Sequence, residues 1–151
     1  MFLTGEKLCE QYIDKYITTR YNHYMRTMDD ISSIKTTLNK FKKEGKITIA
    51  ILFGSYAKNL QHTRSDIDLA LYIKAQNQKE ETEIIDKILM SSDKEIEILR
   101  LNDENEDQFV VQEALDGIHL IEPDEETLYA LYDRALHETE SIRFRRNLSV
   151  G

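Results

Sequence analysis

The chain has 151 residues, a length that fits one domain, because two domains would each be too small to bury a good core. Hydrophobic residues make up 40% and charged residues 32% of the chain, which is the balance of a soluble globular protein. The formal net charge of -8 argues against a large nucleic-acid duplex as a partner, because proteins that bind one usually carry a basic field. A basic protein partner, or a small anion held together with metal ions, suits this charge better.

The sequence also lacks the signals of membrane and secreted proteins. The longest uninterrupted apolar runs, residues 49–53 and 69–73, are far shorter than the about 20 residues that a membrane-spanning helix needs. The first residues show no basic start followed by a long apolar stretch, so we expect a cytoplasmic protein with no membrane partner. The single cysteine, Cys9, can form neither an internal disulfide nor a Cys-rich zinc site.

The chain is expected to form a single domain over residues 1–151, in which residues 1–45 are a helical N-terminal extension. Four-residue spacing of apolar residues predicts a first helix with Thr4 as its N-cap and a second helix that ends before Gly45. The apolar face of the first helix consists of Leu8, Tyr12 and Tyr16. The apolar face of the second helix consists of Ile31, Ile34, Leu38 and Phe41.

The rest of the chain predicts strands separated by turns and helices. The strands are expected over Ile47–Phe53, Asp66–Ile73, Glu95–Leu101 and Ile118–Ile121. The helices are expected over Gln78–Met90, over Glu106–Leu115 and over residues 123–146, the last being a C-terminal helix; the first of these should turn Ile84, Ile85, Ile88 and Leu89 inward. This order predicts an α+β fold, a mixed β-sheet of about four strands flanked by helices.

A candidate phosphate-binding segment follows the first expected strand, which ends in Gly54 and Ser55. Glycine lets backbone N–H groups approach a ligand closely, and the start of a following helix would attract phosphate. The hydroxyl of Ser55 adds a further donor. Lys58 and Ser65, in the same turn-rich segment, complete the candidate nucleotide-binding set, although a solvated loop charge explains Lys58 equally well.

Acidic residues at the start of the second expected strand form a candidate metal site. Asp66 and Asp68 project from the same face of a strand, roughly 6.6 Å apart along the backbone. Carboxylates placed in this way can hold Mg²⁺ together with substrate phosphates, and two ions can act on the attacking and leaving oxygens of an in-line displacement. Glu97 lies in the third expected strand, which we expect to neighbour the strand of the two aspartates. It is the best candidate for a third acid, and Glu95 is its rival. The pattern therefore suggests phosphoryl or nucleotidyl transfer.

These motifs resemble those of a known family. Gly54-Ser55, ten further residues and then Asp66-Ile67-Asp68 are similar to the signature of the DNA polymerase β-like nucleotidyltransferase superfamily. Within it, the segments 52–58 and 65–69 most resemble the minimal nucleotidyltransferases (MntA-like), which pair with HEPN-domain toxins. The close resemblance covers about residues 51–72 and continues more loosely to the C-terminal helix. It implies the polymerase β-like nucleotidyltransferase fold.

The resemblance also implies an activity and a set of roles. Gly54 and Ser55 would hold the triphosphate of ATP, Asp66 and Asp68 would bind Mg²⁺, and Glu97 would take the place of the third acid. The implied reaction is transfer of AMP from ATP to a tyrosine of a cognate HEPN ribonuclease toxin, so that this chain would act as the antitoxin.

The chain departs from the family pattern at two positions. Asn59 stands where the family often has glycine, and Glu97 stands where the third acid is usually aspartate. The longer glutamate side chain would affect the second metal ion more than nucleotide binding. Two other functions stay open: a non-catalytic antitoxin that neutralises the toxin by binding it, and a nucleotidyltransferase that acts on a small molecule.

Overall fold

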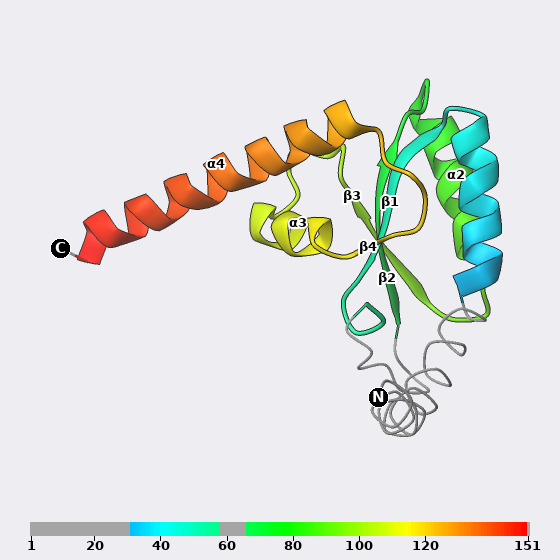
Figure 1. Ribbon diagram of the computed structural model, residues 1–151, viewed down its shortest axis with the longest axis horizontal. Helices are drawn as coiled ribbons and strands as arrows, with labels where there is room; N and C mark the ends of the chain where they lie inside the picture. The colour runs from blue at the N-terminus through cyan, green and yellow to red at the C-terminus, as the bar shows by residue number, and fades with distance from the viewer. Residues whose placement is uncertain (1–30, 58–65, 151) are drawn as a thin grey trace, which may run out of the picture.

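The computed structural model describes residues 31–57 and 66–150. A four-stranded sheet in the order β3-β2-β1-β4 lies at its centre (Figure 1). β1 pairs antiparallel with β2 and β4, whereas β2 and β3 run parallel. The predicted α+β class and the mixed sheet of about four strands are therefore confirmed. The strands are β1 (Ile47–Phe53), β2 (Ile67–Ile73), β3 (Ile96–Arg100) and β4 (Ile118–His119).

Helices cover both faces of this sheet (Figure 1). The helix of residues 31–43 and α2 (Gln78–Leu89) pack on one face, with the first apolar cluster between them and the strands. α3 (Gln108–Leu115) and α4 (Glu125–Val150) pack on the other face against a second apolar cluster. The distal part of α4 runs well beyond the edge of the sheet. The strands are apolar on both sides because both sides are covered.

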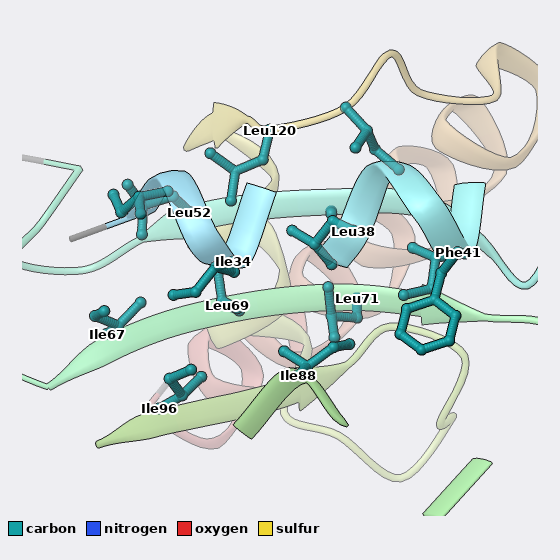
Figure 2. Packing of buried hydrophobic residues seen from close by; sticks show 14 of the residues in the cluster. Ile34, Leu38, Phe41, Leu52, Ile67, Leu69, Leu71, Ile88, Ile96 and Leu120 are labelled. Carbon is teal, nitrogen blue, oxygen red and sulfur yellow. The ribbon is translucent and has the colours of Figure 1, made fainter. Parts of the chain in front are cut away.

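The helix of residues 31–43 is part of the core. Ile34 and Leu38 are fully buried against Leu69 and Leu71 of β2 (Figure 2). All four residues predicted to face inward from this helix are buried, as its four-residue spacing indicates. The first predicted helix, with Thr4, Leu8, Tyr12 and Tyr16, lies outside the described residues.

The alternation predicted for the second strand decides on which face the acids lie. Ala70 and Tyr72 contribute to the cluster on the α3 and α4 side. Asp68, two residues before Ala70, projects from that same face, because side chains alternate along a strand. The opposite face of β2 carries the apolar residues Ile67, Leu69, Leu71 and Ile73.

Three strands are shorter than expected. β2 begins at Ile67, which leaves Asp66 immediately before the strand, and β3 lacks the expected end residues Glu95 and Leu101. The backbone still connects these ends, because the N–H of Ile67 donates to the carbonyl of Glu95 at 2.9 Å. β4 covers only the first two residues of the expected range 118–121, since the chain then turns toward α4.

The helices differ from expectation at their ends. α3 begins at Gln108 because the carboxylate of Asp107 caps it, accepting a hydrogen bond from the N–H of Phe109 at 2.9 Å. On α2 the inward orientation predicted for Leu89 is wrong: its side chain is 38% exposed. The packed face of that helix is narrow and centres on Ile84 and Ile88.

The C-terminal helix is longer than expected. α4 continues to Val150, four residues beyond the predicted end. Its N-terminus carries an Asp124 carboxylate that accepts a hydrogen bond from the N–H of Thr127 at 3.3 Å, which satisfies one of the free donors of the first turn. Across residues 31–57 and 66–150, no helix has the length and apolar character needed to cross a membrane.

Candidate active site

A sharp turn at Gly54 ends β1 and brings the backbone against an acid of the neighbouring strand. Gly54 has a φ of 74°, in the left-handed region that side chains disfavour. A β-carbon at this position would overlap Oδ2 of Asp68 and would lie 3.1 Å from its Cγ. Phe53 is the register partner of Asp68 in the β1–β2 pair. The antiparallel pairing of the two strands therefore places the Asp68 carboxylate beside the turn. Only glycine fits here while that carboxylate keeps its place.

Parallel pairing of β2 and β3 places a second carboxylate beside the first. Asp68 and Glu97 are direct register partners, and their side chains share a hydrogen bond. The predicted adjacency of these two strands is confirmed. Glu95, the rival candidate, precedes β3 and is two residues away from this register position. Glu97 is thus the acid that the fold brings to Asp68.

Electrostatics set Asp68 apart from an ordinary surface aspartate. Burial of the Asp68 carboxyl is the main cause that raises its pKa from 3.8 to about 6, since burial disfavours the charged form. The charge of Glu97 and the hydrogen bond to it raise that pKa further, and the charges of Asp66 and Glu113 contribute in the same direction. Asp68 therefore lies in a concentrated negative field that a cation would relieve.

Asp66 lies close to this pair without joining it in a compact cluster. It is partly buried immediately before β2, and its charge acts on the pKa of Asp68. In the part of the chain that the structure describes, no three or more His, Cys, Asp or Glu side chains are arranged as a group ready to hold a metal ion. The arrangement is a carboxylate pair, Asp68 and Glu97, with Asp66 as a nearby third acid.

The other predicted site residues are only partly described. Ser55 follows Gly54 in the turn and is partly buried. Lys58 and Ser65, the remaining candidates for nucleotide binding, lie outside the described residues, as does Asn59. The structure thus brings Gly54 and Ser55 of the candidate phosphate segment together with the acids of β2 and β3.

One acid near the site was not anticipated from the sequence. Glu113 of α3 is near enough for its charge to raise the pKa of Asp68. It also borders a cavity of about 280 Å³ beside Gly54. The residues that line this cavity are Phe53, Gly54, Ala57, Glu113, Asp116, Gly117 and Ile118. No local pattern signals this placement, because it depends on how α3 packs against the sheet.

The carboxylate pair fits a divalent cation. Asp68 and Glu97 can share a hydrogen bond only while one of them is protonated. Once both are ionised they repel each other, and a bound cation removes that repulsion. Oxygen ligands are those that Mg²⁺ prefers, and it commonly uses one or two carboxylates with substrate phosphates as the other ligands. Asp68 and Glu97 provide two such carboxylates, and Asp66 is a nearby third acid.

Comparisons with known proteins agree with this geometry. The profile of the family described as Polymerase beta, Nucleotidyltransferase matches residues 32–126. This range contains all four strands and every acid of the site. Among curated protein sequences, none matches this chain.

Several solved structures share the fold. A chain of a toxin–antitoxin structure determined with AMP-PNP superposes with a TM-score of 0.59 at 18% sequence identity, covering 77% of this chain and 94% of that chain. A chain of the MntA–HepT toxin–antitoxin structure gives a TM-score of 0.54 at 14% identity, with coverages of 78% and 93%. A chain of the complex of the tri-AMPylated Shewanella oneidensis HEPN toxin with its MNT antitoxin gives a TM-score of 0.52 at 16% identity, covering 78% of this chain and 95% of that chain.

The identities of these solved structures are low enough that they show a common fold and no more. The match to the family supports a stronger conclusion, because it spans more than half of the chain and includes the glycine turn and the acids. The chain therefore belongs to the polymerase β nucleotidyltransferase family, and its fold resembles that of the MntA antitoxins.

Proposed function

We propose that this protein is a Mg²⁺-dependent nucleotidyltransferase that acts as an antitoxin, transferring AMP from ATP to a tyrosine of a cognate HEPN ribonuclease toxin. The observation that carries the proposal is the Asp68–Glu97 carboxylate pair set directly against the Gly54 turn. The family assignment supports the reaction class. The relatives with AMP-PNP or an AMPylated HEPN toxin in their structures support the nucleotide and the partner.

The glycine turn would bind the triphosphate. Gly54 has no side chain to keep a phosphate away from the backbone N–H groups, and the hydroxyl of Ser55 adds a donor. Lys58 and Ser65 would supply further contacts from the segment that follows. The acids Asp68 and Glu97 lie beside this turn, so the α-phosphorus would lie between donors and carboxylates.

Asp66, Asp68 and Glu97 would hold Mg²⁺, which when bound neutralises charge on the phosphates. In the proposed reaction the phenolic oxygen of the acceptor forms a bond to the α-phosphorus. The bond from that phosphorus to the bridging oxygen breaks, and pyrophosphate leaves. The phenolic proton passes to a carboxylate, for which Asp68 and Glu97 are the candidates.

The cavity beside Gly54 is the space open to a nucleoside or an acceptor ring. Its volume of about 280 Å³ is close to the lower end of ligand pockets, about 300 Å³. Phe53 gives it an apolar wall, whereas Glu113 and Asp116 give it an acidic rim. Such a rim repels phosphates, which would keep the triphosphate on the Ser55 side of the turn.

A non-catalytic antitoxin is the second candidate. The observation in its favour is that the described acids do not form a ready group of three metal ligands. Transfer to a small molecule is less well supported, because the solved structures that share the fold come from toxin–antitoxin complexes.

Intact-mass spectrometry separates the three candidates. The full chain would be incubated with ATP and Mg²⁺ alone, with a HEPN protein encoded beside it, or with a set of hydroxyl-bearing small molecules. The proposal expects the mass increment of AMP on the HEPN protein, located on tyrosine by fragmentation. Neutralisation of the ribonuclease without any mass change would support the binding-only antitoxin and contradict the proposed transfer.

A further inference from the structure

We propose that Tyr56 and Lys94 form a clamp that positions the Gly54–Ser55 turn relative to Glu97 and thereby sets the affinity for the nucleotide triphosphate. The inference rests on the proposed function for its ligand, but its geometry stands on contacts that lie outside the carboxylate site. Tyr56 and Lys94 are positioning residues, because neither belongs to the proposed triphosphate or metal contacts.

The two side chains meet at the phenolic hydroxyl. The Lys94 ammonium donates a hydrogen bond to the phenolic oxygen of Tyr56 at 2.5 Å. The same nitrogen lies 5.2 Å from the centroid of the Tyr56 ring, beyond the hydroxyl edge of the ring, so the hydrogen bond is the contact between these two side chains. Tyr56 is 1% exposed and belongs to the apolar cluster on the first face of the sheet. Its ring is therefore held by packing, and Lys94 is attached to a fixed point.

The contact connects parts of the chain that the sheet itself leaves unconnected. Tyr56 follows β1, and Lys94 precedes β3. In the strand order β3-β2-β1-β4, β2 separates these two strands, so they share no backbone ladder. The clamp is thus a direct side-chain link between the end of β1 and the start of β3.

This position gives the clamp a role in the site. Tyr56 immediately follows Ser55, and Lys94 lies three residues before Glu97. A shift of the turn relative to β3 would change the separation between the phosphate donors and the Glu97 carboxylate. Small misplacements at such sites are costly, because binding and transfer both depend on the relative positions of the groups. Holding both ends on one buried ring limits that shift.

The chain offers a matched control. The Lys87 ammonium lies 5.9 Å from the centroid of the Phe41 ring, and Phe41 belongs to the same apolar cluster as Tyr56. Lys87 comes from α2 and Phe41 from the helix of residues 31–43, so this pair links no site element. Lys87→Met therefore removes the contact of another lysine with an aromatic ring of this cluster, without touching the turn or β3.

The test uses the full chain with Tyr56→Phe, Lys94→Met, both together, and Lys87→Met. Tyr56→Phe keeps the buried ring and removes only the hydroxyl, so the fold is retained. By calorimetry with ATP and Mg²⁺, each single change should raise the dissociation constant about fivefold, as expected for the loss of one hydrogen bond. The two changes together should weaken binding by less than the sum of their separate effects, because both remove the same hydrogen bond. Lys87→Met should bind as the unmodified protein does.

Amide hydrogen exchange gives a second readout that does not depend on ATP. Tyr56→Phe and Lys94→Met should accelerate exchange in the turn after β1 and at the start of β3, and should leave α3 unchanged. If the unmodified protein does not bind ATP, the proposed function is contradicted, and amide hydrogen exchange alone tests the clamp. If ATP binds to the unmodified protein and to all four variants with equal affinity, or if exchange at the two sites is unaltered, the clamp is refuted.

Discussion

Replacing Gly54 by alanine should abolish nucleotidyl transfer while the domain stays folded. The reason is steric and local. A β-carbon at Gly54 would overlap Oδ2 of Asp68 and lie 3.1 Å from its Cγ, so the carboxylate must rotate away from its position beside Glu97. The backbone adds a second cost, because Gly54 has a φ of 74°, where alanine is disfavoured.

The two costs act on different properties. The left-handed backbone should lower the free energy of unfolding by about 1–2 kcal/mol, which is small against the about 5–15 kcal/mol of a typical domain. The overlap is relieved by rotation of a short carboxylate side chain, so it adds little to that loss of stability. Displacement of Asp68 removes it from the reacting groups, and we expect transfer to fall at least about a hundredfold, or about 2.7 kcal/mol in the barrier.

Gly45→Ala is the matched control. Gly45 has a φ of 73°, yet a β-carbon there meets nothing within 4 Å. It should lower the thermal midpoint about as much as Gly54→Ala does and leave transfer unchanged. Thermal unfolding and transfer from ATP would be measured on both variants. If Gly54→Ala retains as much transfer as Gly45→Ala, the steric link between Gly54 and Asp68 does not control the site.

Glu97→Gln should lower transfer at least tenfold, about 1.4 kcal/mol, with partial rescue by raised Mg²⁺, whereas Glu95→Gln should have little effect; the opposite result would place the third acid at Glu95. The pKa of Asp68 is raised from 3.8 to about 6. Between these pH values the folded protein keeps a proton on Asp68 that the unfolded chain has released. Above pH 6 the carboxylate is ionised in both states, and its charge then lowers the stability of the folded protein. Asp68→Asn should accordingly raise the thermal midpoint at pH 8 and have little effect near pH 4; an equal gain at both would show that charge is not the cause. Changing Asp66 and Asp68 together to Asn should leave circular dichroism unchanged and abolish transfer, and an active double variant would contradict the enzymatic proposal.

Local sequence patterns were sufficient for the parts of the site that depend on strand periodicity. The alternation after Asp66 predicts that Asp68 lies opposite the apolar face of its strand, and the structure confirms this. The adjacency expected for the strand with Glu97 is also confirmed, by the parallel register of β2 and β3. The first of these predictions succeeds because a period of two fixes the face of every residue in a strand.

Contacts that depend on packing between distant elements were not predictable. Glu113 acts on Asp68 only because α3 lies over the β1–β2 end of the sheet. Tyr56 and Lys94 form a hydrogen bond although β2 lies between the two strands that they adjoin, β1 and β3. The role of Gly54 also differs from expectation: the close approach that it permits in this structure is that of Asp68, in addition to the phosphate approach that the motif suggests.

The most direct test of the central claim is to follow the two ends of ATP separately. The full chain and a HEPN protein encoded beside it would be incubated with Mg²⁺ and ATP radiolabelled at either the α- or the γ-phosphorus. The proposed chemistry predicts that the α label becomes attached to a tyrosine of the HEPN protein and the γ label leaves in pyrophosphate, with both lost in Asp68→Asn. Attachment of the γ label, or α labelling that persists in Asp68→Asn, would contradict nucleotidyl transfer at this carboxylate pair.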